Sequence, residues 1–260
     1  MRSDTQSLVG FATVRGLFGI IGWPSLPGAQ SHHRFQPALM THKTFCPALA
    51  KLPAPQRQIW PQLAPLAKQS WVLHGGTAIA LRLGHRDSVD FDFFTERLLD
   101  RQALLNALPP LAAATTIQDE PNTYTAIVCG VKVSFFGSIT FGRVGHPQIT
   151  NDGVAFVASL EDLMAQKLKV VMQRVESKDY RDIAALLRAG QTLESGMSGA
   201  GALYGMSFSP MDCAKALVYF KGGDLALVPP ADRTTLMNAV RALRMTSFAP
   251  AALLSKSLAP

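Results

Sequence analysis

Residues 73–94 read Leu-His-Gly-Gly-Thr-Ala-Ile-Ala-Leu-Arg-Leu-Gly-His-Arg-Asp-Ser-Val-Asp-Phe-Asp-Phe-Phe, and the rest of the chain is arranged around this stretch. An apolar lead-in at 71–73 ends in a pair of glycines, and a short helical run over 77–83 follows them. Residues 89–93 then alternate strictly between apolar and acidic side chains, as a half-buried strand does. The stretch therefore predicts a strand, a glycine turn, a short helix and a second strand in close succession.

Two acidic residues stand out on the second strand. Asp90 and Asp92 are two positions apart, so their side chains project from one face while Val89, Phe91 and Phe93 point to the core. Neighbouring carboxylates repel each other unless a cation lies between them. Hard oxygen ligands suit Mg²⁺, which usually brings substrate phosphates with it. The glycines upstream offer backbone N–H groups at a helix start, where phosphate is favoured. A phosphate turn beside a metal pair indicates nucleotide chemistry.

Each of these features has a plainer interpretation when it is taken alone. An Asp-x-Asp pair can be two solvated acids on a surface strand, and Gly75-Gly76 can be a tight turn. His74 is expected to pack or hydrogen-bond rather than to act as a base. The order of the features favours the functional interpretation. Arg86 and Ser88 flank the carboxylates, where they could donate to a phosphate or fix the approach of the strand.

The composition bounds the class of protein. The chain has 260 residues, 48% of them hydrophobic, so it can bury a core in one large or two small domains. Its 25 Lys and Arg against 18 Asp and Glu give a formal charge of +7, which suits a polyanionic partner such as RNA but is also common in plain soluble proteins. Its 3 cysteines form neither a disulfide framework nor a zinc pattern, which indicates a reducing compartment. The cysteine pattern therefore leads us to expect a cytoplasmic protein. No run reaches the roughly 18 apolar residues of a membrane span, so we expect no membrane partner.

The pattern of elements predicts an α/β fold of the α+β type, with a small mixed-sheet domain followed by a helical domain. We place the sheet domain at 40–158 and the helical domain at 159–245. Residues 1–39 differ from the rest and are expected to be a disordered leader or an over-extended gene start. The Ser-, Ala- and Pro-rich residues 246–260 are expected to form a frayed tail.

Periodicity and turn residues locate the other elements of both halves. The sheet half is expected to contain helices over 55–68 and 100–108, strands at 115–118, 124–129 and 131–136 with a bulge at the last turn, a loop over 137–153 and an edge strand at 154–157. The helical half is expected to contain a long helix over 160–189, continuous or broken near Ser177, a Gly/Ser-rich loop over 195–207, and helices starting at 210 and 231.

The helix predicted over 160–189 is the second informative part of the chain. At about 100° per residue, four charged residues fall on one stripe of it: Lys167, Arg174, Lys178 and Asp182. The plain interpretation is a solvated charged face. The functional interpretation is a cationic wall over triphosphate oxygens, because Arg supplies a bidentate fork and Lys a point charge. In that case Asp182 orients one of the cations or holds the acceptor.

These two regions together resemble a known family. Gly75-Gly76-Thr77 followed by Arg86-x-Ser88-x-Asp90-x-Asp92 is similar to the first motif of the polymerase-beta-type nucleotidyltransferase superfamily. More narrowly, it resembles the AbiEii toxin family of bacterial toxin–antitoxin and abortive-infection systems. The charged residues between 161 and 183 are similar to that family's downstream helix motif. The resemblance covers most of the chain between 55 and 220.

The resemblance implies an activity and its partners. Members of the family are Mg²⁺-dependent nucleotidyltransferases, and some add nucleotides to the 3′ end of tRNA and so block translation. They are usually paired with an antitoxin encoded nearby. The resemblance thus implies transfer of a nucleoside monophosphate from a nucleoside triphosphate (NTP) to an RNA hydroxyl, with tRNA as the acceptor. A small molecule or a protein stays open as an alternative acceptor.

The resemblance also implies roles for individual residues. It implies that the Gly75–Thr77 turn holds the triphosphate and that Asp90 and Asp92 bind Mg²⁺, or Mn²⁺ in its place. It implies that Lys167 contacts phosphate and that Asp182 is a catalytic or acceptor-positioning group. The candidate nucleotide-binding residues are therefore Gly75, Gly76, Thr77, Arg86, Ser88, Lys167 and Arg174, and the candidate catalytic residues are Asp90, Asp92, Lys167 and Asp182.

One position departs from the superfamily pattern. The superfamily commonly places a third carboxylate on a later strand, where it helps to bind a second metal ion, but the matching strand 131–136 offers Lys132 and Ser134. Two-metal chemistry stabilises both the attacking and the leaving oxygen. Three explanations stay open. Asp182 replaces the missing acid, one metal ion suffices as in some family members, or the protein is a catalytically degenerate nucleotide- or RNA-binding module that acts through a partner.

Overall fold

The strands β2 (Val72–His74) and β3 (Phe91–Phe94) are antiparallel neighbours at the centre of a mixed sheet in the computed structural model, which describes residues 42–244 and 248–260. The leader expected at 1–39 lies outside the described residues. The sheet has eight strands in the order β1-β7-β8-β2-β3-β6-β5-β4. The other strands are β1 (Thr44–Phe45), β4 (Thr115–Glu120), β5 (Thr123–Val128), β6 (Val131–Phe136), β7 (Gln148–Thr150) and β8 (Phe156–Val157).

Aromatic side chains fill one face of the central strands. Phe91, Phe93 and Phe135 are fully buried, and the rings of Phe93 and Phe135 stack 5.8 Å apart across the parallel pair β3–β6. The predicted alternation is thus confirmed for Phe91 and Phe93. It is wrong for Val89, whose side chain is 55% exposed, because β3 begins only at Phe91 and the Val89 carbonyl accepts a hydrogen bond from the Gln56 side chain instead.

Two details of the sheet differ from expectation. The β5–β6 hairpin has a two-residue turn in which Cys129 (φ 50°) and Gly130 (φ 79°) both adopt left-handed backbone, so Val128 pairs directly with Val131 without the expected bulge. The bulge of this half lies instead on β4, between Thr116 and Gln118. The expected edge strand is an interior strand, because the expected loop contains β7, which pairs with β8 on the side away from β2.

Prolines divide the first helical region of the sheet half. In place of one helix over 55–68, the chain forms α1 (Ala54–Ile59), a 3₁₀ turn (Trp60–Leu63) and α2 (Pro65–Lys68). Pro61 is the second residue of the 3₁₀ turn and Pro65 begins α2, because proline has no N–H to donate to the preceding turn. The predicted short helix is α4 (Arg101–Ala107), whose N-terminus is capped by the Asp100 side chain.

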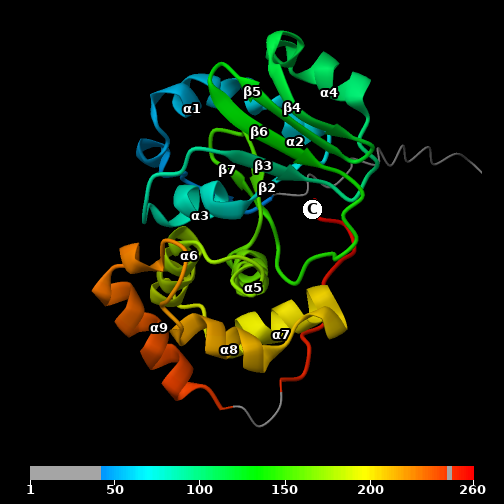
Figure 1. Cartoon of the computed structure of the whole chain (residues 1–260). Coiled ribbons are helices and arrows are strands. Elements are labelled where there is room, and N and C mark those ends of the chain that lie inside the picture. The colour runs from blue at the N-terminus through cyan, green and yellow to red at the C-terminus, as the bar shows by residue number, and fades with distance from the viewer. Residues whose placement is uncertain (1–41, 245–247) are drawn as a thin grey trace, which may run out of the picture. The chain divides into compact units, whose positions relative to one another are not determined.

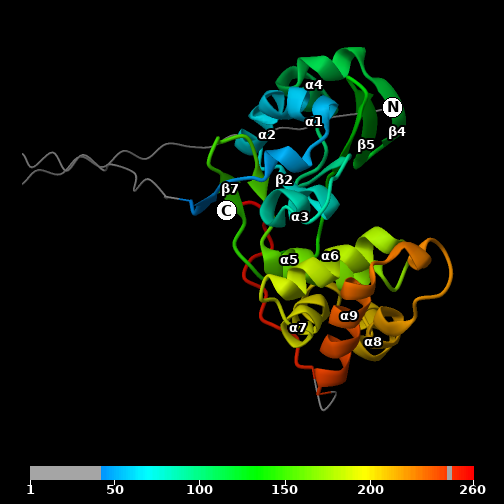
Figure 2. The ribbon, with the colours of Figure 1, turned by 90° about the vertical axis from the view of Figure 1, so that its left-hand side faces the viewer.

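The helix α3 (Gly75–Leu83) connects β2 to the segment before β3 and ends at Gly84 in the left-handed conformation (φ 63°). It contacts β2 and β3 on one side and the helices α5 (Leu160–Val170) and α6 (Ser177–Arg188) on the other. Figure 1 and Figure 2 both show α3 between the sheet and these two helices. The N-terminus of α3 therefore lies where the sheet and the helical half meet.

The helical half begins three residues after the sheet ends, and its long helical region is broken at Ser177, as one of the two expectations had it. The remaining helices are α7 (Leu193–Tyr204), α8 (Pro210–Val218) and α9 (Pro230–Ala242). The α/β class, with a mixed sheet followed by helices, is confirmed. None of the helices in the described ranges is both long enough and apolar enough to cross a lipid bilayer.

The expected Gly/Ser-rich loop over 195–207 is wrong, because most of it is the helix α7. Its glycines form a close contact with α5. A Cβ atom at Gly196 would lie 2.7 Å from the Met164 side chain, and one at Gly199 would lie 3.3 Å from the Ala165 Cβ. Glycine lowers helix propensity, but here its missing side chain lets the two helices approach.

The expected frayed tail is also wrong for the residues described after 247. The Ala251 N–H donates to the Ser198 carbonyl on α7, and Leu258 is buried. The Ser257 hydroxyl donates to Glu96, while the Ser257 carbonyl accepts from the Arg143 side chain. These contacts, most of them through the backbone, give the segment partners in both halves, which the Ser-, Ala- and Pro-rich composition did not indicate.

Candidate functional site

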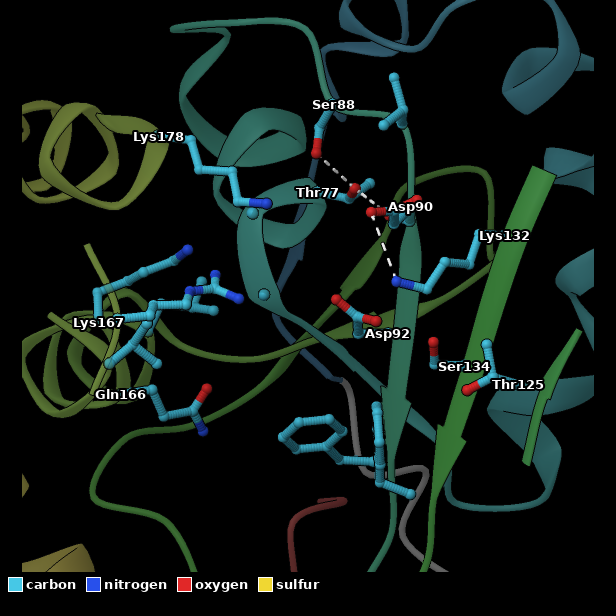
Figure 3. Close-up of a pocket in the computed structure, with 18 of the residues that line it drawn as sticks. Thr77, Ser88, Asp90, Asp92, Thr125, Lys132, Ser134, Gln166, Lys167 and Lys178 are labelled. Atoms are coloured by element: carbon cyan, nitrogen blue, oxygen red, sulfur yellow. Dashed lines mark hydrogen bonds and ion pairs between the residues drawn. The ribbon is translucent and has the colours of Figure 1, made fainter. Parts of the chain in front are cut away.

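A cavity of about 660 Å³ lies where α3, β3 and β6 meet the helices α5 and α6. The start of α3 and the segment 86–90 line it, together with side chains of β3, β6 and α5. Figure 3 shows Lys167 and Lys178 on the opposite side of the cavity from Asp90 and Asp92. The cavity thus brings together the two regions that the sequence singles out, which lie about seventy residues apart in the chain.

The acid pair, Asp90 and Asp92, faces this cavity from β3 and the residue just before it. Burial raises the pKa of the Asp92 carboxyl above its usual range, and the charge of Asp90 adds to this effect. The nearest cation to Asp90 is Lys132 on β6, whose Nζ lies 4.0 Å from Asp90 Oδ2. Ser134 pairs with Asp92 in the register of the two strands.

The acid pair fits a single divalent ion. Two carboxylates on one side of a cavity are the protein ligands that Mg²⁺ commonly uses when substrate phosphates complete its coordination. The part of the chain that the structure describes contains no cluster of three or more His, Cys, Asp or Glu side chains able to hold a metal by themselves. A metal ion at Asp90 and Asp92 would therefore depend on a phosphate ligand from the substrate.

Gly75 and Gly76 form the glycine turn at the start of α3. Gly75 has a left-handed backbone (φ 73°), and a Cβ there would lie 2.8 Å from Asp92 Oδ2. A Cβ at Gly76 would lie 2.3 Å from the Arg86 guanidinium. Only glycine lets the helix start approach both side chains this closely. No side chain caps the first N–H groups of α3, so an anion in the cavity can accept from them.

Thr77 and Ser88 hold the segment that leads to the acid pair. The Thr77 hydroxyl bonds the Ser88 hydroxyl at 2.8 Å and also the Asp90 carbonyl oxygen. Both side chains are buried although they line the cavity. Their hydroxyls therefore fix the strand against α3, which is one of the two roles considered for Ser88 in the sequence.

Asp182 on α6 is the centre of a buried charge cluster, which consists of Asp182, Asp179, His85, Arg86, Lys167 and Arg174. Arg86 approaches Asp182 with Nε at 2.6 Å and Nη2 at 2.9 Å, and His85 Nε2 lies 2.7 Å away. Lys167 Nζ lies 2.7 Å from Asp182 Oδ2. Burial by itself would raise the pKa of Asp182, but the charge of Lys167 and the hydrogen bonds from His85 and Arg86 hold it far below its usual range.

Asp179 completes the buried charge cluster and is itself fully buried. It accepts from Lys167 Nζ at 2.7 Å and from Arg174 Nε at 2.8 Å. Burial opposes its ionisation, but the hydrogen bond from Arg174 and the charge of Lys167 lower its pKa below the usual range. The Arg174 side chain is 45% exposed and lines the cavity. Asp179 thus orients two cations toward the same space.

The structure changes how the charged residues of this region relate to one another. They do not lie on one stripe of a continuous helix, because the chain leaves α5 at Val170 and resumes at Ser177. Ion pairs across this break bring Lys167 to Asp182. Asp182 is fully buried and is not among the residues that line the cavity. Asp182 holds Arg86 and Lys167 in place by these ion pairs, and its expected role as a catalytic or acceptor-positioning group stays a prediction.

Several residues of the site were not singled out from the sequence. His85 supports Asp182, and its position next to Arg86 was the one available signal. Gln166 lines the cavity and contacts His74, with Gln166 Oε1 3.0 Å from His74 Nδ1. His74 is buried and stacks on the Phe94 ring at 4.7 Å, and burial lowers its pKa to about 4. The packing role expected for His74 agrees with this environment.

Known proteins are similar to this chain over the region that contains the cavity and its charged residues. The profile of a family described as "Nucleotidyl transferase AbiEii toxin, Type IV TA system" matches residues 62–205. An uncharacterized protein of Aquifex aeolicus (strain VF5) is 31% identical over 143 residues, which cover 54% of this chain and 69% of that protein. The matched residues include the glycine turn, the acid pair and the buried charge cluster.

Proposed function

The chain belongs to the AbiEii nucleotidyl transferase toxin family, and from that premise we propose that it transfers a nucleoside monophosphate from an NTP to a hydroxyl group of RNA, with the 3′ end of tRNA as the acceptor. The observation that carries the proposal is the convergence on one cavity of an uncapped helix start, two carboxylates and several cations. A cavity of about 660 Å³ has the size of a small-molecule site. As a toxin, the protein would act in the cytoplasm under the control of an antitoxin encoded nearby.

The triphosphate is assigned to the space between the glycine turn and the cations of the helical half. The N–H groups at the start of α3 donate to phosphate oxygens from one side. Lys167, Arg174 and Lys178 line the other side of the cavity and neutralise the charge of the triphosphate. Asp179 and Asp182 hold Lys167 and Arg174 by short ion pairs, so these two cations do not pair with the acid pair instead.

The chemical step follows from this placement. The oxygen of the acceptor hydroxyl attacks the α-phosphorus, the bond from that phosphorus to the oxygen shared with the β-phosphorus breaks, and pyrophosphate leaves. The hydroxyl proton passes to water on the open side of the cavity, where the Asp90 side chain is 37% exposed. A Mg²⁺ ion held by Asp90 and Asp92 supplies charge stabilisation for the phosphoryl oxygens when it is bound. The protein contributes positioning and fixed positive charge.

A second candidate function rests on Ser134. It pairs with Asp92 in the strand register and lines the cavity at the point where the superfamily commonly has a third acid. This observation favours a module that binds a nucleotide without transferring it. Such a module would share the glycine turn and the cations, and would differ only in turnover.

A transfer assay separates the two functions. The purified protein is incubated with total tRNA and, in turn, with each NTP labelled at the α-phosphate, in the presence of Mg²⁺ or Mn²⁺. The variant Asp92→Asn and the surface control Asp212→Asn are assayed in parallel. Asp212 is an exposed residue of α8, so its variant should label RNA as the wild type does. We expect label in RNA for the wild type and its loss in Asp92→Asn. NTP binding without label transfer under either metal would favour the second function and contradict the first.

A further inference from the structure

The strand β6 presents one neutral side chain, Ser134, and one cationic side chain, Lys132, to the acid pair. Neither of these two positions is an acid. Ser134 lies opposite Asp92 in the parallel register, and Lys132 lies two residues earlier on the same face of β6. Lys132 Nζ lies 4.0 Å from Asp90 Oδ2, and its side chain is 45% exposed. Figure 3 shows Asp92 and Ser134 on the two strands, with Asp90 just before β3 and beside Lys132.

The acids that line the cavity offer few ligands for a second divalent ion. The lining residues include one further acid, Asp87, in the described part of the chain. Its side chain is 73% exposed and its nearest cation is Lys51, 3.9 Å away. A second Mg²⁺ beside Asp92 would meet the Ser134 hydroxyl and the ammonium of Lys132 in place of a carboxylate. The Lys132 ammonium and a second divalent ion are both positive and would repel each other beside Asp92, so they compete for the same place.

The electrostatic balance indicates what Lys132 does there. Two carboxylates, one ammonium and one divalent ion have the same net charge as three carboxylates with two divalent ions. The exchange of an acid for Ser134 and of a metal ion for Lys132 therefore leaves the total charge of the site unchanged.

On the basis of the proposed function, we infer that the Lys132 ammonium takes the place of a second metal ion, so that the site binds one divalent ion with each nucleotide. Lys132 then faces the acceptor oxygen and the α-phosphate across the acid pair, where negative charge develops during transfer. An ammonium needs no carboxylate ligand beyond Asp90, which is consistent with Ser134 at the neighbouring position. Lys132 is in this sense a catalytic residue.

The test counts metal ions. Mn²⁺ bound per chain is measured by equilibrium dialysis and by paramagnetic resonance, with an NTP analogue whose α,β-bridge cannot be cleaved. The variants are Lys132→Met, Lys132→Arg and the double variant Lys132→Met with Ser134→Asp. We expect one Mn²⁺ in the wild type and in Lys132→Arg, and two in the double variant, which restores the acid and removes the ammonium. Unchanged thermal unfolding checks that each variant is folded.

Transfer rates provide the second measurement. Lys132→Met should lose about a hundredfold in rate, since removal of one hydrogen-bond donor aimed at developing negative charge costs about 10²–10³ in rate. Lys132→Arg should retain most of the rate. Two Mn²⁺ ions in the wild type, or a Lys132→Met rate equal to wild type, would overturn the inference and leave the proposed function standing. Failure of the wild type to bind the analogue with Mn²⁺ would overturn both.

Discussion

Arg86 and Asp182 meet edge to edge although they are 96 residues apart in the chain, with Nε on Oδ1 and Nη2 on Oδ2. Arg86 belongs to the segment between α3 and β3, whereas Asp182 belongs to α6. The pair therefore ties the sheet half to the helical half. The same guanidinium lies against the glycine turn, since a Cβ at Gly76 would overlap its Nη2. The Arg86–Asp182 pair therefore joins the two halves directly beside the glycine turn.

Replacing Asp182 should destabilise the protein strongly. Asp182→Asn leaves Arg86 and Lys167 buried with too little negative charge, because both are paired with this carboxylate. Removal of one partner from a buried ion pair costs about 3–5 kcal/mol. Urea unfolding at neutral pH measures the loss, with Asp212→Asn on the surface of α8 as the control. A loss in Asp182→Asn no larger than in the control would contradict the importance of the buried charge cluster.

His74 should make the protein less stable below neutral pH. Its pKa falls from 6.5 to about 4 in the folded state because of burial, so between these values the unfolded chain binds a proton that the folded chain does not. Stability from this group is therefore complete above pH 6.5 and is lost as the pH falls toward 4, by about 3 kcal/mol in total.

His74→Phe should flatten this pH dependence, because the ring can still stack on Phe94 but no longer titrates. Chemical unfolding at several pH values between 4 and 7 measures it. His42→Gln is the control, since His42 is exposed. If the free energy of unfolding changed with pH by the same slope in His74→Phe and in the wild type, another group would be the cause of the acid sensitivity.

Gly75→Ala should weaken nucleotide binding more than its backbone strain explains. Gly75 has φ 73°, and the added Cβ would lie 2.8 Å from Asp92 Oδ2, so the acid pair must move. Gly153 is a matched control, because its φ is 74° and nothing lies within 4 Å of a Cβ there. Both variants should lose about 1–2 kcal/mol of stability from the left-handed backbone.

The two glycine variants should differ in affinity. We expect an NTP dissociation constant about tenfold higher in Gly75→Ala, equivalent to about 1.4 kcal/mol, and an unchanged value in Gly153→Ala. Calorimetric titration with an uncleavable NTP analogue and Mg²⁺ measures both. Equal affinities in the two variants would mean that the glycine turn does not contact the phosphates.

Lys178 should contribute to substrate binding without stabilising the fold. It lines the cavity, its side chain is 48% exposed, and its ion pair with Glu176 is on the surface. Lys178→Met should change the free energy of unfolding by less than about 0.5 kcal/mol and should raise the KM for NTP. Lys215→Met on α8 is the control, since Lys215 is 70% exposed and lies away from the cavity lining. An unchanged KM for NTP in Lys178→Met would mean that Lys178 does not contact the phosphates.

The local parts of the site could be predicted from the sequence because they depend on short-range periodicity. The strand spacing put Asp90 and Asp92 on one face, and the glycine pair marked the start of α3. The buried charge cluster could not be predicted in the same way. Its contacts cross a break between two helices, and the direction in which the chain resumes at Ser177 is a matter of tertiary packing.

Glycine was the residue most easily misinterpreted. Gly196 and Gly199 suggest a loop by their propensity, whereas the structure uses them to pack α7 against α5. Val89 continues the apolar alternation but lies before the strand and is exposed. In both cases a tertiary contact, with α5 or with Gln56, decided the outcome over the local pattern.

The mass of the acceptor shows whether this chain transfers a nucleoside monophosphate at the acid pair. A defined tRNA is incubated with the protein, an NTP and Mg²⁺, and is then weighed by mass spectrometry while released pyrophosphate is counted. We expect a gain of one or more whole nucleoside monophosphate units, one pyrophosphate for each unit, and no gain with Asp92→Asn. No gain in the wild type, or a gain of a single phosphate group, would contradict it.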